Sequence, residues 1–131
     1  MTDDDSYQRG IARRNAILGS NTGQRTSFFH ELAPDLERVV IENLWGGTYC
    51  RPGLEPRIRA LCTVTLLAGL GHLQQVRLHI GGALNVGASK EEIVEALQQM
   101  MWYVGLPAFS SALQVANEVF QERGLGAAAA P

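Results

Sequence analysis

The sequence predicts an all-α fold, a bundle of about six helices joined by short connections. Apolar residues recur at helical spacing along nearly all of the 131 residues. Glycine and proline interrupt these stretches where helices typically end, and no two segments show the alternation of paired strands. With 46% hydrophobic residues, we expect one compact domain over 1–131, with frayed ends at 1–5 and 125–131.

The first predicted helix spans 5–18, where apolar residues alternate with arginines, and Gly19 stops it. The stretch 19–33 is polar and is predicted to be a connection. His30 lies in this connection, where we expect its side chain to be solvated. The first helix therefore leads into a loop.

Pro34 can open a second helix, because its ring is compatible with a first helical turn. This helix is expected to end at Gly46 and Gly47, which places Glu42 in its last turn. A carboxylate there opposes the helix dipole. We therefore expect Glu42 either to have a partner or to serve a functional role.

A third helix is predicted from Pro56 to Gly71 and holds Cys62 in an apolar run. We interpret Cys62 as a small buried hydrophobic residue and both cysteines as free thiols. Cys50 lies beside Arg51, a cation that could make the thiol reactive. Packing or pocket lining is the favoured interpretation of Cys50.

Three further helices complete the predicted bundle. The fourth covers roughly 72–86 and ends at Gly87. Ser89 and Glu92 form a capping box, which predicts the start of the fifth helix. The sixth begins at Pro107 and ends before Gly124. Short connections between such helices favour an all-α bundle.

Composition and charge exclude several functional classes. The formal net charge is −2, and the 11 basic residues are spread along the chain instead of clustered, so we expect no nucleic-acid partner. The first residues are acidic and polar, unlike a secretory signal, and no run of about 18 apolar residues follows. We therefore expect a soluble, cytoplasmic protein without a membrane partner.

His79 is the ionisable side chain that most needs an explanation. It lies on the apolar face of the predicted helix 72–86 and is the one group there that can move a proton near neutral pH. Gly81 and Gly82 follow it and remove side-chain bulk. Their spacing is equally compatible with a pocket beside the imidazole and with a close helix crossing.

No metal or cofactor site is expected. His72 and His79 are seven residues apart, about 10 Å along a helix, which is too far for one ion. The glycine-rich pieces lack the strand-then-helix context of a phosphate cradle.

Several motifs together resemble the carboxymuconolactone decarboxylase family, and within it the 4-carboxymuconolactone decarboxylase branch. The resemblance spans nearly the whole chain. It is carried by Glu42 and Trp45 with Gly46, RPGL at 51–54, Arg59, LH at 78–79, ALN at 83–85, Tyr103, Gly105 and Pro107.

The resemblance implies an all-helical subunit of the alkylhydroperoxidase-like type, assembled into a ring-like hexamer or trimer. It also implies decarboxylation of a small carboxylate without a cofactor. We expect Glu42, Arg51 and His79 to be catalytic. We expect six residues to bind the substrate: Trp45, Tyr49, Cys50, His72, Gln75 and Tyr103.

The chain also departs from that branch at several positions around Glu42 and Arg51. Members usually carry an aromatic residue at position 43, an acidic one at 47, Trp at 49, a small hydroxyl residue or Ala at 50, and Asn at 86. This chain has Asn, Gly, Tyr, Cys and Val there. The pocket wall is therefore altered, which favours a different ring compound, such as one of a biosynthetic pathway.

The three catalytic candidates suit the loss of CO2. The electrons left behind must delocalise into a sink, such as the carbonyl of a lactone with a conjugated alkene. Arg51 could bind the carboxylate or the developing oxyanion through its planar fork. His79 would protonate carbon, while Glu42 sets the tautomer of the imidazole and raises its pKa.

Structural roles are the alternative for each candidate. A lone His on an apolar face is often a core residue. Glu42 could pair with an arginine of a neighbouring helix, and Arg51 could stabilise the RPG turn or a subunit contact. For Trp45, Trp102 and Tyr103, packing in a core or interface is the default, with a pocket wall second.

Three other functions remain open. The first is the redox branch of the superfamily, in which a CxxC precedes the His. His72 and Gln75 occupy those cysteine positions, so a thiol peroxidase is disfavoured. The second is a non-catalytic helical oligomer or binding protein. The third is an isomerase, dehydratase or cyclase that uses the same acid-base groups.

Overall fold

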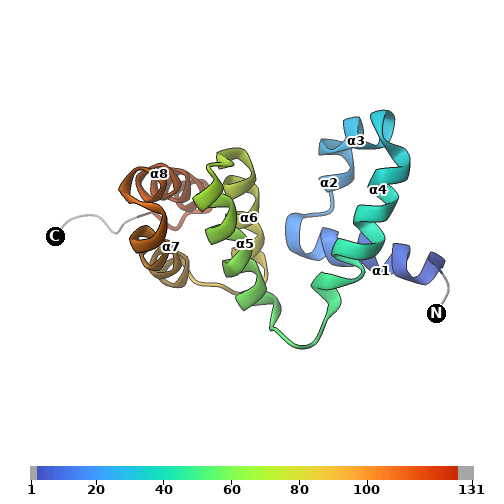
Figure 1. Cartoon of the computed structure of the whole chain (residues 1–131), viewed down its shortest axis with the longest axis horizontal. Coiled ribbons are helices and arrows are strands. Elements are labelled where there is room, and N and C mark those ends of the chain that lie inside the picture. Colours follow the sequence, from blue (N-terminus) through green and yellow to red (C-terminus); the bar gives the residue numbers. More distant parts are fainter. Residues whose placement is uncertain (1–2, 127–131) are drawn as a thin grey trace. The chain divides into compact units, whose positions relative to one another are not determined.

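The computed structural model describes residues 3–126 and is all-helical, which confirms the predicted fold class (Figure 1). No strand occurs in this range. The α-helices are α1 (Asp3–Leu18), α2 (Thr22–Arg25), α3 (Ser27–Leu32), α4 (Pro34–Val40), α5 (Pro56–Leu70), α6 (Leu73–Asn85), α7 (Lys90–Val104) and α8 (Leu106–Glu122). Two short turns complete the set: η1 (Ile41–Trp45), a π-helix, and η2 (Thr48–Cys50), a 3₁₀-helix.

The chain forms two compact units, Met1–Pro56 and Arg57–Pro131. The single domain expected over 1–131 stays a prediction. The helix α1 begins at Asp3, within the stretch 1–5 that was expected to fray. Residues 1–2 and 127–131 lie outside the described range.

In the first unit, α1 packs closely against η1. Gly10 makes this approach possible, because a Cβ at this position would lie 2.1 Å from the Ile41 carbonyl oxygen. Gly46, directly after η1, also allows the close approach, since a Cβ there would lie 2.3 Å from the Ser6 carbonyl oxygen in α1. The backbones of α1 and η1 are therefore in contact at two positions where only glycine fits, and this contact determines where η1 lies on α1.

The stretch 19–33 is a correction to the prediction, because it holds α2 and α3 instead of an open connection. Side chains stabilise this region locally. Thr22 Oγ1 donates to the Gly19 carbonyl oxygen at 2.6 Å, and Arg25 Nη2 donates to the Leu18 carbonyl oxygen at 2.8 Å. Such hydrogen bonds satisfy backbone groups at helix ends. With these two short helices, the described residues hold eight α-helices instead of six.

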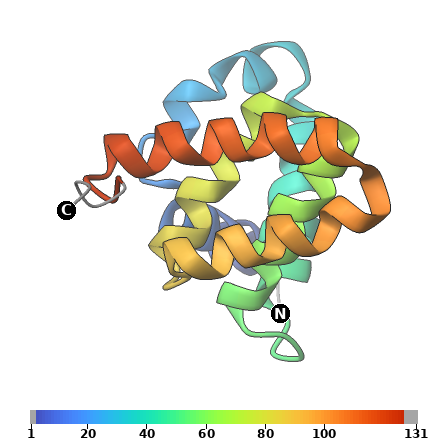
Figure 2. The ribbon, with the colours of Figure 1, turned by 90° about the vertical axis from the view of Figure 1, so that its left-hand side faces the viewer.

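The second unit consists of α5 to α8. Figure 2 shows α7 and α8 side by side and running in opposite directions, and α8 also packs on α6. Its core consists of small and branched apolar side chains from all four helices. Val64, Val76, Ile80, Ile93 and Leu97 are fully buried. Small residues such as Ala68 and Ala116 let the helices approach one another.

The predicted capping box at the start of α7 is confirmed. Ser89 Oγ accepts from the Glu92 amide and Glu92 Oε1 accepts from the Ser89 amide, each at 3.0 Å. The other Glu92 oxygen pairs with Arg57 at the start of α5. Glu92 thereby links α5 to α7, and together with Ser89 it provides hydrogen-bond partners for amides at the start of α7 that have none within the helix.

Cys62 is a correction. It is an exposed free thiol on α5, instead of the buried hydrophobic residue expected from its apolar neighbours. Its neighbours on the core face are Ala60 and Val64. A helix turns by 100° per residue, so an apolar run of this length also places members on the solvent side.

Within residues 3–126, none of the helices combines the length and apolar character that a bilayer crossing requires.

Candidate functional site

Glu42 lies in η1, the π-helical turn that continues α4. Arg38 Nε is 2.8 Å from Glu42 Oε1, one turn earlier on the same face. The guanidinium of Arg38 also lies over the Tyr7 ring, 4.8 Å from its centroid. Glu42 Oε1 is buried and accepts no hydrogen bond within the described residues. π-helical turns occur frequently at functional sites. In this one, the Glu42 carboxylate has Arg38 as a charge partner, while its Oε1 atom can still accept a hydrogen bond.

Trp45, Tyr49 and Cys50 cluster at the end of the first unit. The rings of Trp45 and Tyr49 are buried, with centroids 4.5 Å apart and planes tilted by 35°. The Cys50 thiol is half-buried and donates to the Trp45 carbonyl oxygen at 3.2 Å. The close packing of these residues determines where the chain leaves η2.

Arg51 follows this cluster directly. Its backbone is extended, with φ −69° and ψ 134°, and its side chain is exposed at the surface of the first unit. Pro52 and Gly53 come next, which restricts the backbone after the arginine. The first unit thus brings together five of the sequence-predicted site residues: Glu42, Trp45, Tyr49, Cys50 and Arg51.

Three other predicted residues lie along α6 in the second unit. His72 is the N-cap residue and Gln75 lies in the first turn, both with exposed side chains. His79 lies one turn after Gln75 and is mostly buried, next to the fully buried Ile80. The positions that carry cysteines in a CxxC-His motif are therefore an exposed His and an exposed Gln in this chain.

The electrostatic state of His79 differs from the prediction. The sequence predicts a pKa raised by Glu42, but burial lowers the pKa of the His79 imidazole from 6.5 to about 4. Taking the charged form out of water is unfavourable, so the neutral imidazole dominates at pH 7. Strongly perturbed groups are enriched at functional sites, although core histidines show the same direction of shift.

Gly81 makes room for a residue that the sequence did not point to. A Cβ at Gly81 would lie 2.9 Å from Arg123 Nη2. Arg123 donates to the Gly81 carbonyl oxygen at 3.3 Å and to Asn85 Oδ1 at 2.9 Å. The glycine therefore serves the packing of the end of α8 on α6, which favours the helix-crossing interpretation at this position. Arg123 lies beyond the last predicted apolar position, so no periodic signal could have identified it.

The profile of the carboxymuconolactone decarboxylase family matches residues 34–118. The chain belongs to this family.

Individual relatives agree with the family. The 4-carboxymuconolactone decarboxylase of Acinetobacter baylyi is 31% identical over 126 residues, which is 95% of this chain and 94% of the relative. The nitrosuccinic acid decarboxylase of Metarhizium robertsii is 30% identical over 129 residues, or 92% and 88% of the two chains. An uncharacterized 15.0 kDa protein of Paracoccus denitrificans is 36% identical over 94 residues, 70% of each chain.

The resemblance to the carboxymuconolactone decarboxylase family is thus confirmed, and two relatives of the chain are named as decarboxylases. The matched range includes Glu42 and Arg51 in the first unit and His79 in the second. That these three form one catalytic site stays a prediction.

Tyr103 lies in the last turn of α7, on the surface of the second unit. Its side chain and that of Trp102 are each 81% exposed. Neither aromatic ring packs in the core of this unit, so of the expected core or interface packing only the interface stays a prediction. An interface or a pocket wall remains open for Tyr103.

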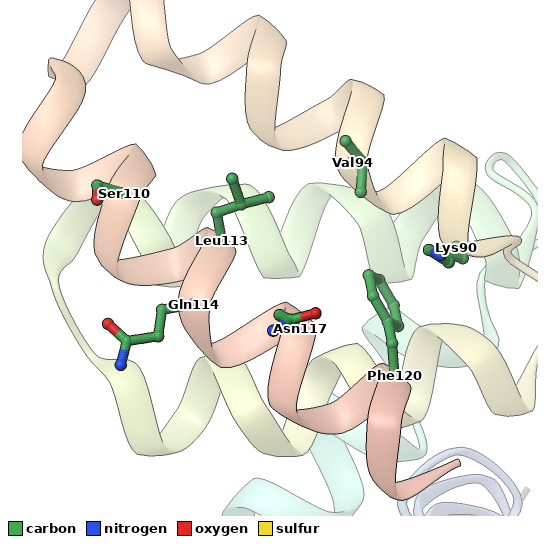
Figure 3. A pocket seen from close by; sticks show the side chains of 7 residues that line it. All are labelled: Lys90, Val94, Ser110, Leu113, Gln114, Asn117 and Phe120. Carbon is green, nitrogen blue, oxygen red and sulfur yellow. The ribbon is translucent and has the colours of Figure 1, made fainter. Parts of the chain in front are cut away.

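A groove of about 480 Å³ lies between α7 and α8 in the second unit (Figure 3). Leu113 and Phe120 point into it from α8 and Val94 from α7, while Lys90 closes one end with its ammonium 6.0 Å from the Phe120 ring centroid. None of the residues that line it belongs to the predicted site of this carboxymuconolactone decarboxylase family member. Apart from Lys90, its lining carries no group that could move a proton.

Proposed function

We propose that this chain is a decarboxylase that uses no cofactor and acts on a small carboxylic acid such as 4-carboxymuconolactone. Membership of the carboxymuconolactone decarboxylase family carries this proposal, together with two relatives that are named as decarboxylases. The substrates in those two names differ in skeleton, since one is a lactone and the other a nitro acid. Both place an electron-withdrawing group near a carboxyl group.

This shared feature explains why no cofactor is required. When CO2 leaves, the electron pair of the broken C–C bond must delocalise, and a conjugated lactone carbonyl or a nitro group can accept it. The negative charge then resides on oxygen, and carbon must take up a proton. The protein has to bind two anionic oxygens in turn and deliver one proton.

His79 is our candidate for the proton transfer. Its support is a mostly buried imidazole with a pKa lowered to about 4, on an apolar helix that offers few other titratable groups. A neutral imidazole cannot be the acid at the outset. An anionic substrate bound beside it would raise its pKa, so that the imidazole takes up a proton on binding and then passes it to carbon.

Glu42 and Arg51 are our candidates for the charge contacts of the same site. Arg51 carries a planar guanidinium that can bind a carboxylate with two parallel hydrogen bonds. Glu42 has a buried oxygen without a hydrogen-bond donor in the described residues, which could accept from the imidazole N–H.

We also propose that the protein forms a homo-oligomer, a hexamer or a trimer. Support comes from large apolar side chains at one end of the second unit that are exposed in the single chain: Leu66, Leu70, Trp102, Tyr103 and Leu106. Exposed apolar surface of this kind marks interaction sites. Analytical ultracentrifugation should give a mass several times 14.2 kDa, and a monomer at micromolar concentration would exclude the oligomer.

The decisive experiment incubates the purified protein with 4-carboxymuconolactone and follows CO2 release and the product by mass spectrometry. Nitrosuccinic acid is the second substrate to test. A product that has lost CO2 supports the proposal, whereas a product of unchanged mass would support an isomerase or cyclase. Turnover of a peroxide with a dithiol donor would instead favour the redox branch.

A further inference from the structure

A small cavity in the first unit combines two arginines with a thiol. Its volume is about 350 Å³, and it is lined by Arg9, Ala12, Arg13, Ala16 and Cys50. The four α1 residues are spaced i, i+3, i+4 and i+7, so they form one stripe on that helix. The cavity thus lies between one face of α1 and the end of η2.

Arg9 is fixed in place on this face. Its Nε donates to the Gly46 carbonyl oxygen at 2.8 Å, which ties the guanidinium to the turn after η1. The contact also determines the distance between α1 and the segment that carries Cys50. Arg9 therefore acts as a rigid, positively charged part of the wall.

Arg13 lies one turn further along α1, on the same stripe. Within residues 3–126 its guanidinium forms no hydrogen bond or ion pair with a carboxylate. Ala12 and Ala16 flank it and leave the space beside it open. The half-buried Arg13 guanidinium, with only the small side chains of Ala12 and Ala16 beside it in the cavity, is suited to bind an anion from solution.

Cys50 places this cavity next to the candidate site. Its thiol proton is directed to the Trp45 carbonyl oxygen, and the following residue is Arg51. A ligand in the cavity would therefore contact the chain immediately before Arg51, our candidate for a carboxylate contact. The cavity and Arg51 both belong to the first unit, where Cys50 connects them.

We propose that the Arg9–Arg13–Cys50 cavity binds the carboxylate that the substrate keeps when it loses CO2. This inference rests on the proposed function and deepens it, because it assigns the second carboxyl group of such a substrate to a cavity of named residues. Both acids named for the relatives carry a second carboxyl group besides the one next to the electron-withdrawing group. A second cationic pocket would orient such a substrate and select against monocarboxylic acids.

The two cysteines provide a direct test that needs no turnover. We would measure the rate at which iodoacetamide alkylates each thiol by peptide mass spectrometry, with succinate as the probe and chloride to keep the ionic strength constant. At a succinate concentration about ten times its dissociation constant, we expect alkylation of Cys50 to slow about tenfold. Alkylation of Cys62, exposed on α5, should not change.

Variants and a neutral analogue identify the cause of protection. Arg13→Gln should abolish the protection of Cys50, while Arg14→Gln, a charge-matched control outside the cavity on the same helix, should retain it. Succinamide, which has no charge, should not protect. Circular dichroism checks that both variants remain helical.

The inference is overturned if succinate leaves the Cys50 rate unchanged, if Arg13→Gln is protected like the parent protein, or if Cys62 is protected equally. Decarboxylation assays separate this result from the proposed function. If the protein releases CO2 from its substrate but succinate does not protect Cys50, only the proposed role of this cavity is excluded. If succinate protects Cys50 but no CO2 is released, the cavity is supported and the proposed decarboxylase function is contradicted.

Discussion

Arg38 Nε lies 2.8 Å from Glu42 Oε1 at the point where α4 becomes the π-helix η1. The sequence places a carboxylate at a helix end where the dipole disfavours it, and this cation one turn earlier offsets that disadvantage. The pair is only partly satisfied, because the same carboxylate oxygen accepts no hydrogen bond within the described residues. Glu42 therefore has a structural partner and retains an acceptor for a second one.

Replacing Glu42 by Gln tests whether that acceptor takes part in the reaction. We expect Glu42→Gln to lower kcat about 100-fold, the scale of a group that assists proton transfer. Arg38→Gln removes only the structural partner, which is half exposed, and should change the unfolding free energy by less than about 1 kcal/mol. Steady-state CO2 release and urea unfolding check both variants. Equal activity losses in the two would assign Glu42 a structural role.

Replacing His79 by Gln tests the proton transfer itself. We expect a folded protein whose kcat is reduced at least about 100-fold, because α6 (Leu73–Asn85) carries no other histidine, cysteine or carboxyl side chain that could replace the imidazole. His30→Gln is the matched control, since His30 is exposed in the first unit and pairs with Glu37 at 3.0 Å. Full activity of the His79 variant would remove this residue from the mechanism.

The lowered pKa of His79 also predicts how stability depends on pH. The unfolded chain binds a proton at His79 near pH 6.5, whereas the folded protein binds it only near pH 4. Between these values the unfolded state holds more protons, so the contribution of His79 to stability is complete above pH 6.5 and is lost as the pH falls to 4.

The size of this effect can be measured by comparison with a variant that does not titrate. Between pH 7.5 and 4.5 the parent protein should lose on the order of 2 to 3 kcal/mol more unfolding free energy than His79→Gln. Urea unfolding at the two pH values gives the difference. Parallel pH profiles for the two proteins would contradict the lowered pKa.

Two glycine-to-alanine substitutions should differ sharply in their cost. A Cβ at Gly10 meets the Ile41 carbonyl oxygen at 2.1 Å, which is backbone and cannot move away without separating α1 from η1. A Cβ at Gly81 meets the tip of Arg123, which can rotate. We expect Gly10→Ala to cost about 3 kcal/mol or more and Gly81→Ala less than about 1 kcal/mol. Denaturant unfolding measures both, and a similar cost for the two would show that the close α1–η1 contact is unimportant.

Much of the fold was predictable because helix ends depend on neighbours in the sequence. Helices begin at or next to the predicted Pro34, Pro56 and Pro107, and the Ser89 capping box is observed. The short helices α2 and α3 were not predicted. They depend on hydrogen bonds such as that from Arg25 to the Leu18 carbonyl oxygen, and the spacing of hydrophobic residues gives no sign of such bonds.

The candidate site was predictable to a smaller extent. Family-like motifs pointed to Glu42, Arg51 and His79, and the family membership is confirmed. The state of these groups was not predictable. The direction of the His79 pKa shift does not follow from a motif, because it depends on how much water the folded chain excludes around the imidazole. The partner of Glu42 is Arg38, four residues earlier in the chain, instead of an arginine from a neighbouring helix.

By itself, then, the sequence determined the all-α class, the ends of the long helices and the family, since these follow from local propensity and from matching motifs. Tertiary structure decided which side chains are buried and what fills the space around them. It exposed Cys62, placed Arg123 over Gly81 and opened a cavity between Arg13 and Cys50. The physical reason is that burial and contact join residues far apart in the chain, whereas sequence patterns report only the helix on which a residue lies.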